Sequence, residues 1–107
     1  MKKFISILIL TLSFETYAEV VYARSTTITQ VNAYDDVANV AAYIYLDKSH
    51  DDCPNGAYLN PNSPGFDSLY ALTLAAFMSN KTVTFQLYND RKHSDRCEVD
   101  AIQVLAN

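Results

Sequence analysis

The sequence predicts an α+β fold, with a mostly antiparallel sheet or a partly open barrel, one helix and one disulfide. Three observations support this prediction. Several short segments are rich in β-branched and aromatic residues, which suit strands. A single segment in the second half carries helix start and stop signals. The chain has only 2 cysteines, Cys53 and Cys97, and it begins like an exported precursor.

The first 18 residues have the three parts of a signal peptide. Lys2 and Lys3 are followed by a mostly apolar stretch at 4–14 and by a cleavage site that ends in Ala18. The stretch is shorter than the roughly 20 apolar residues that span a bilayer. We expect cleavage after Ala18, with a cut after Ala23 as the alternative. The mature protein would then be secreted or periplasmic.

Residues 19–107 are predicted to form a single small domain, because no repeat, linker or low-complexity tract interrupts them. Loss of Lys2, Lys3 and Glu15 with the signal changes the net charge from −4 to −5. This acidic balance argues against nucleic acid as a partner, since phosphate binding needs a basic surface. It equally argues against an anionic membrane surface, and we expect no membrane insertion after cleavage.

Cys53 and Cys97 are predicted to form a disulfide, because exported proteins fold in an oxidising compartment and only one pairing exists. A metal site or a catalytic thiol is the alternative, but the distance between the cysteines and the positions of His50 and His93 do not match metal-ligand spacing. The bond would stabilise the fold by roughly 4 kcal/mol.

In the first half of the mature chain we expect a strand at 20–31, a turn at 32–36 and a strand at 37–46. The second strand alternates, which predicts a core face and a tyrosine face. The core face comprises Val40, Ala42, Ile44 and Leu46, and the other face carries Ala41, Tyr43 and Tyr45.

In the second half we expect a short strand at 57–60, a helix at 65–79, a strand at 82–88, a solvated hairpin tip at 89–96 and a last strand at 97–105. Ser63 is the predicted N-cap of the helix, with Pro64 in its first position. Asn80 suits the left-handed residue that ends a helix. Val83, Phe85 and Leu87 are expected to point inward. An OB-like barrel is a compact way to close such a sheet.

The predicted helix has no charged residue between Asp67 and Lys81. One stripe is expected to face the core, and it comprises Phe66, Leu69, Tyr70, Thr73 and Phe77. Two interpretations of the opposite face remain open. Its small residues need no partner, or the helix is buried on both sides, against the sheet and against another subunit.

No pattern in the sequence indicates catalysis, a cofactor or a metal, so we predict that the protein is not an enzyme. His50 and His93 lie in charged segments, and the mature chain lacks a glycine-rich phosphate loop. Asp47, Asp51 and Asp52 lack the spacing of a calcium loop. Tyrosine is abundant, with 8 in the chain and no tryptophan. Tyrosines suit sugar and protein interfaces, although strand propensity alone accounts for most of them.

The segment from Cys53 to the C-terminus resembles a group of short exported bacterial proteins of unknown function. The similarity lies in the first cysteine, the small-residue helix Leu-Tyr-Ala-Leu-Thr-Leu-Ala-Ala, the step Ser-Asn-Lys-Thr-Val into a strand, and the second cysteine before the last strand. Asn80 stands where these proteins usually have glycine. More distantly, size, signal, element order and tyrosines are similar to B subunits of AB5 toxins of the subtilase cytotoxin kind. That resemblance implies an OB-like, ring-forming, glycan-binding subunit, but it carries no site residue over to this chain.

Two functions follow as hypotheses. The first is a secreted or periplasmic binding module, a toxin-B-like subunit that binds glycans and forms a homo-oligomer. The second is a monomeric periplasmic accessory or inhibitor-type protein that binds another protein. The sequence identifies no ligand-binding residue for either.

Overall fold

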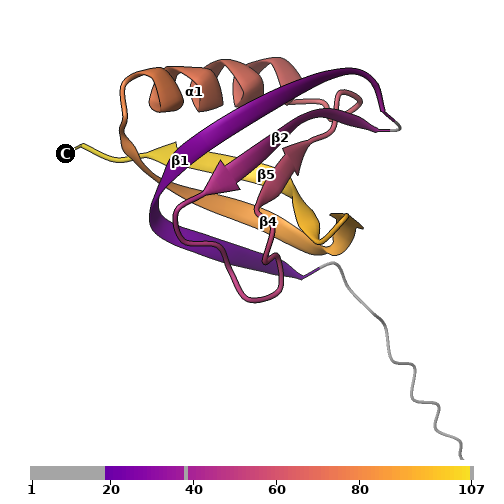
Figure 1. Cartoon of the computed structure of the whole chain (residues 1–107), viewed down its shortest axis with the longest axis horizontal. Coiled ribbons are helices and arrows are strands. Elements are labelled where there is room, and N and C mark those ends of the chain that lie inside the picture. Colours follow the sequence, from indigo (N-terminus) through magenta and orange to yellow (C-terminus); the bar gives the residue numbers. More distant parts are fainter. Residues whose placement is uncertain (1–18, 38, 107) are drawn as a thin grey trace, which may run out of the picture.

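Five strands form one sheet that closes into a barrel, and one helix lies across an end of it (Figure 1). The computed structural model describes residues 19–37 and 39–106, and of Asp36 only the backbone. The elements are β1 (Val20–Val37), β2 (Val40–Leu46), β3 (Ala57–Leu59), α1 (Phe66–Met78), β4 (Thr82–His93) and β5 (Arg96–Val104). The predicted signal peptide, residues 1–18, lies outside the described part. No described helix is both long and apolar enough to cross a membrane.

The strand order around the barrel is β1-β2-β3-β5-β4. Every neighbouring pair is antiparallel except β3 and β5, which run parallel. The predicted α+β fold is therefore confirmed, and the sheet takes the barrel form rather than an open one. The helix between β3 and β4 provides the connection that brings the chain back around the barrel.

The barrel is closed by β1, which is much longer than predicted. A turn at 32–36 was expected, but β1 continues to Val37, and Asn39, just before β2, has a φ of +57°. The first part of β1 pairs with β4 and the later part pairs with β2. Register shifts, one of them between Ala23 and Thr26, let the strand bend without leaving the sheet.

The β4–β5 hairpin is also longer than predicted. We expected a solvated tip at 89–96, but β4 extends to His93 and β5 begins at Arg96. Only Ser94 and Asp95 form the turn, with φ values of +52° and +64°. Two left-handed residues match the twist of a tight hairpin. The charged sequence therefore continues as paired strand, and its side chains join the outer face of the barrel.

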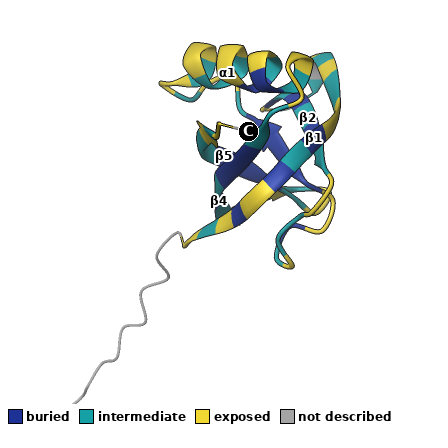
Figure 2. Cartoon of the chain, turned by 90° about the vertical axis from the view of Figure 1, so that its left-hand side faces the viewer, coloured by how far each residue is buried: buried dark blue, intermediate teal, exposed yellow. Residues whose placement is uncertain are grey.

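The interior of the barrel follows the predicted alternation. Val83, Phe85 and Leu87 of β4 are fully buried, as are Ala42 and Ile44 of β2 (Figure 2). These side chains belong to one apolar cluster that also receives the inner face of the helix. The two inward-facing predictions are confirmed.

The helix begins differently from the prediction and ends as expected. Its N-cap is Gly65 and no side chain caps it, so Ser63 is not the N-cap. Instead, the Ser63 hydroxyl donates to Glu98, whose carboxylate is nearly inaccessible to water. At the other end Asn80 has a φ of +55°. The Asn80 amide donates to the carbonyl of Phe77 and that of Lys81 to Ala76, which is a Schellman motif.

The helix buries one side only within the described chain. The predicted stripe packs on the barrel, with Thr73 fully buried and Ala76 nearly so. The opposite face exposes Leu72 and Met78, the latter with 79% of its surface accessible. The outer face is thus more apolar than a set of small residues, and the described residues leave both side chains exposed.

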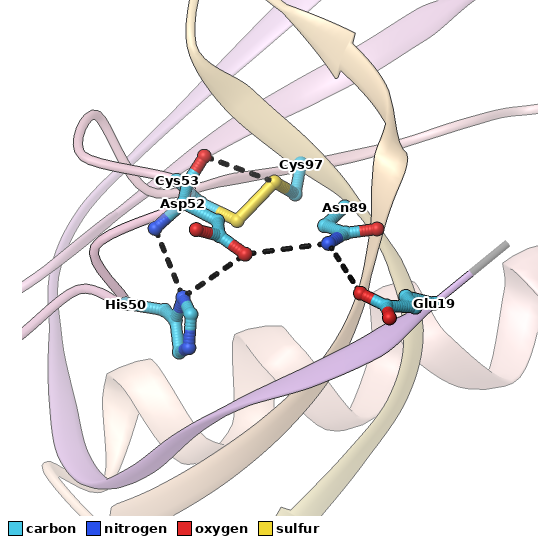
Figure 3. The surroundings of a disulfide bond; sticks show 6 residues. All are labelled: Glu19, His50, Asp52, Cys53, Asn89 and Cys97. Atoms are coloured by element: carbon cyan, nitrogen blue, oxygen red, sulfur yellow. Dashed lines mark hydrogen bonds and ion pairs between the residues drawn. A yellow bond between two sulfur atoms is a disulfide. The ribbon is translucent and has the colours of Figure 1, made fainter.

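The predicted disulfide is present. Cys53 and Cys97 are fully buried, with Cα atoms 5.5 Å apart, and they join the loop before β3 to the start of β5 (Figure 3). Gly56 completes the adjacent turn with a φ of +104°. A Cβ at this position would collide with the carbonyl oxygen of Ile44, so the loop requires glycine there.

Candidate functional site

A row of side chains crosses all five strands on the outer surface of the barrel. The strand register pairs Asn32 with Tyr43, Tyr43 with Tyr58, Tyr58 with Glu98, and Glu98 with Tyr88. We call these five residues the outer row. Because alternate residues of a strand point to opposite faces, the buried neighbours of the row fix its outward direction. The row brings together residues that lie up to 66 positions apart in the chain.

One end of the outer row is organised by Glu98. Its Oε1 accepts hydrogen bonds from the Tyr58 hydroxyl at 3.3 Å and from Asn60 Nδ2 at 3.2 Å. Its Oε2 accepts from Ser63 Oγ at 3.4 Å and from Arg91 Nη1 at 3.3 Å. Glu98 is only 5% exposed, and a buried carboxylate needs such partners. Burial, followed by the charge and hydrogen bond of Glu98, raises the pKa of Tyr58 to about 12.

Tyr88 extends the same pattern. Its hydroxyl donates to Asp100 Oδ1 at 2.6 Å, and the Arg91 guanidinium lies 4.0 Å from the centre of its ring. The hydrogen bond to Asp100, and then burial, raises the pKa of Tyr88. A groove of about 380 Å³ separates this cluster from the start of α1. We call this cluster the paired half, and its members are Tyr58, Asn60, Ser63, Tyr88, Arg91, Glu98 and Asp100.

The other end of the outer row is organised by Arg96. Its guanidinium lies 3.8 Å from the ring centre of Tyr43 and 5.2 Å from that of Tyr45. Nη2 donates to the Tyr45 hydroxyl at 2.9 Å, and Nη1 donates to the carbonyl of Ser94 at 3.3 Å. Nε is buried, and no described group accepts its hydrogen. No carboxylate of a described side chain forms an ion pair with Arg96.

The tyrosines beside Arg96 are oriented by Asn32. Gln30 Nε2 donates to Asn32 Oδ1 at 2.7 Å, which turns the Asn32 amide group toward two hydroxyls. Asn32 Nδ2 lies 3.3 Å from the Tyr34 hydroxyl and 3.5 Å from the Tyr45 hydroxyl. Both hydroxyl oxygens thus act as acceptors. Among the described residues, neither hydroxyl has an acceptor for its own hydrogen.

We call this second cluster the open half, and its members are Asn32, Tyr34, Tyr43, Tyr45 and Arg96. The rings of Tyr34 and Tyr43 meet edge to face at 4.9 Å. An open groove of about 350 Å³ adjoins the cluster and is lined by Tyr45 and Arg96 together with Thr29, Ser49 and Asn55. The aromatic faces and spare donors of this half suit a ligand that offers apolar surface and acceptor oxygens.

His93 lies between the two halves. Its Nδ1 is 2.7 Å from the Tyr43 hydroxyl, and its ring centre is 5.7 Å from that of Tyr43 and 6.1 Å from that of Tyr58. We had interpreted His93 as a solvated residue of a charged loop. That interpretation is wrong, because β4 continues to His93 and places its ring against the outer row.

The remaining polar cluster surrounds the disulfide at the far end of the 47–56 loop (Figure 3). His50 Nδ1 accepts from the Asp52 amide at 2.9 Å, and Asn89 Nδ2 donates to Asp52 Oδ2 at 3.3 Å and to Glu19 Oε1 at 3.2 Å. These contacts tie the loop to β4 and to the start of β1. In the part of the chain that the structure describes, no group of three His, Cys, Asp or Glu side chains could hold a metal ion.

The sequence predicted only part of this arrangement. Tyr43 and Tyr45 do share the outer face, and Tyr88 points outward as expected. Arg96, Glu98 and Tyr58 were missed as site residues. The signal that could have found the first two is the alternation of Arg96, Glu98 and Asp100 with the buried Cys97 and Val99.

Comparison of the chain with protein-family models and with curated proteins finds no match.

Proposed function

We propose that this protein is an exported, non-enzymatic carbohydrate-binding module whose ligand lies on the open half. The observation that carries the proposal is the cluster of Tyr34, Tyr43, Tyr45 and Arg96 with unused hydrogen-bond donors. Tyrosine rings offer flat apolar surface with a polar tip, which matches the mixed surface of a sugar. The disulfide fits an oxidising compartment, as export would require.

The position of the cluster in the barrel also supports a carbohydrate ligand. OB-like barrels bind oligonucleotides and oligosaccharides on the face of strands 2 and 3 and on the loops between strands 1 and 2 and strands 4 and 5. Tyr43 and Tyr45 lie on β2, and Arg96 follows the β4–β5 turn. The net charge of −5 expected for the mature chain disfavours an oligonucleotide, which leaves oligosaccharides as the class that fits.

The test is a glycan array followed by calorimetric titration of the best glycan. We expect Tyr43→Ala and Tyr45→Ala each to weaken binding by about 10-fold or more, as stacking residues at the centre of a site do. Tyr22→Ala is the matched control, because Tyr22 is also an outer tyrosine of the barrel with an arginine, Arg24, 4.3 Å from its ring centre. An array without hits, or equal losses in all three variants, would contradict the proposal.

A second function rests on a different observation, the exposed Leu72 and Met78 on a helix that has no charged residue after Asp67. It is an accessory or inhibitor-type protein that binds another protein through this face, or a subunit that binds copies of itself there. Sedimentation velocity separates the last case, since Met78→Glu should dissociate an oligomer built on this face. A monomer at all micromolar concentrations would rule out the homo-oligomer, and a ring-forming toxin-B-like subunit with it.

A further inference from the structure

Resting on the carbohydrate-binding function proposed above, we infer that the sugar is acidic and that Arg96 binds its carboxylate. The proposal follows from the balance of donors and acceptors in the open half. Arginine has five N–H donors, and the guanidinium of Arg96 makes only two hydrogen bonds to described groups. The Tyr34 and Tyr45 hydroxyls accept from Asn32 and keep their own hydrogens free. The open half thus keeps unused donors and contains no carboxylate to accept them.

The charge of Arg96 also favours a ligand with a carboxylate. The paired half contains an arginine in a comparable setting, since Arg91 also lies over a tyrosine ring. Arg91 has a carboxylate partner, however, with Nη1 at 3.3 Å from Glu98 Oε2. The Tyr43 ring, whose centre lies 3.8 Å from the guanidinium carbon, restrains the Arg96 side chain, and Nη1 and Nη2 each make one hydrogen bond and keep a second N–H for a carboxylate. A ligand carboxylate would supply the partner that no described side chain supplies.

The groove beside Arg96 fits a sugar ring attached to that carboxylate. Its volume of about 350 Å³ lies within the range of small-molecule sites. Besides Tyr45 and Arg96, the neutral polar side chains of Thr29, Ser49 and Asn55 and the apolar side chains of Leu46 and Pro54 line it. The polar groups can bind hydroxyls without adding charge. The lining thus offers one charged contact, at Arg96, and otherwise neutral contacts.

The overall charge favours one carboxylate over a densely charged ligand. An expected net charge of −5 repels polyanions, and the open half provides a single arginine against that field. A sugar with a single negative charge can make the contact with Arg96 and is repelled least by the net negative charge of the protein. We therefore expect uronic-acid-type sugars to bind better than sulfated or phosphorylated oligosaccharides.

The experiment is a calorimetric titration with a panel of oligosaccharides that end in a hexuronic acid, each paired with its methyl ester. The ester keeps the sugar and removes the charge. We expect the acid to bind about 10- to 100-fold more tightly than its ester, which is the contribution of hydrogen bonds to a charged group. Arg96→Gln should abolish this preference, and Tyr45→Phe should reduce it. Arg91→Gln, the matched control, should retain it.

Each outcome decides a different point. Equal affinity for acid and ester would overturn the role of Arg96 and leave the carbohydrate-binding function in place. Loss of the preference in Arg91→Gln as well as in Arg96→Gln would assign it to general charge rather than to the open half, which also overturns the proposal. Absence of binding by any acid, ester or array glycan would overturn both proposals. Thermal unfolding of each variant shows whether it is folded, and Tyr45→Phe provides the test should Arg96→Gln unfold.

Discussion

The two halves of the outer row are built from the same kinds of residue and use them differently. Each half has an arginine over a tyrosine ring, at 4.0 Å in the paired half and 3.8 Å in the open half. Each half contains tyrosines with a bonded hydroxyl. In the paired half those hydroxyls donate to Glu98 and Asp100. In the open half the hydroxyls of Tyr34 and Tyr45 accept from Asn32, and that of Tyr45 also accepts from Arg96.

The carboxylates account for this difference. Glu98 receives four donors and connects β5 to β3, to β4 and to the segment before the helix. These four hydrogen bonds therefore stabilise the folded state, because removing any one of them leaves a buried polar group without a partner. The open half has no equivalent acceptor among its described members. The same residue types thus stabilise the fold where a carboxylate is present and remain available to a ligand where it is absent.

The largest effect should come from the disulfide, because Cys97 lies between Arg96 and Glu98 and so anchors both halves. Replacing both cysteines by serine, Cys53→Ser with Cys97→Ser, should lower the free energy of unfolding by roughly 4 kcal/mol. Chemical denaturation measures this change. Reducing agent should destabilise the wild-type protein by a similar amount and leave the double variant unchanged. A loss below about 1 kcal/mol would mean that the barrel holds the two halves without the bond.

Glu98→Ala should have the next largest effect. It removes the acceptor of four donors, and Tyr58 is too deeply buried to bond to water instead. We expect a loss of about 2 to 3 kcal/mol in the free energy of unfolding. Asp100→Ala is the matched control, because it removes one acceptor from a less buried position, and about 1 kcal/mol is expected. Equal losses would show that the network around Glu98 is no stronger than a single hydrogen bond.

The stability of the paired half should also depend on alkaline pH. The pKa of Tyr58 is raised from an ordinary 10.0 to about 12 in the folded state, so between these values the folded protein retains a proton that the unfolded chain loses. The stabilisation is complete below pH 10 and declines as pH rises toward 12, by roughly 1 to 2 kcal/mol. Unfolding titrations at several pH values measure it. Tyr58→Phe should lack this decline in stability between pH 10 and 12. If the unfolding free energy of the variant fell as steeply with pH as that of the wild type, Tyr58 would not be its cause.

The sequence predicted the elements that depend on local pattern. Alternation identified the inward residues of β2 and β4, and the left-handed preference of Asn80 located the end of the helix. The disulfide followed from the single possible pairing of two cysteines and the oxidising compartment that export implies. Each of these features is determined within a few residues of chain or by a single possible pairing, so one sequence suffices to predict it.

Features that depend on strand register were missed. Asn32 and Tyr34 looked like part of a turn, because nothing local shows that β1 bends through a bulge and continues along β2. Ser63 looked like an N-cap, but its hydroxyl bonds to Glu98, 35 positions away. His93 and Arg96 looked solvated, since charged residues are usually exposed. Their contacts with Tyr43 arise only when the hairpin lies against β2 and β3, which a local pattern does not predict.

A matched pair of tyrosines gives the smallest expected effect and the sharpest comparison of the two halves. Tyr58→Phe removes a donor to the buried Glu98 and should lower the free energy of unfolding by about 1 kcal/mol. Tyr45→Phe removes an acceptor whose donors, Asn32 and Arg96, lie in a partly exposed region where water can replace the hydroxyl. We expect a change within about 0.5 kcal/mol, measured by denaturation under identical conditions.

Tyr58→Phe should have the larger effect on stability, but Tyr45→Phe should have the larger effect on affinity when a glycan is titrated into the two variants. Tyr45→Phe should weaken binding and leave the fold intact, whereas Tyr58→Phe should bind like the wild type while it is folded. A hydroxyl that stabilises the native state has its hydrogen bonded already, so it has little to offer a ligand. If Tyr45→Phe destabilised the protein as much as Tyr58→Phe, the open half would be a structural network like the paired half. The place to look for a ligand would then move to the groove beside the helix, where Ser63, Leu69 and Asp100 form part of the lining.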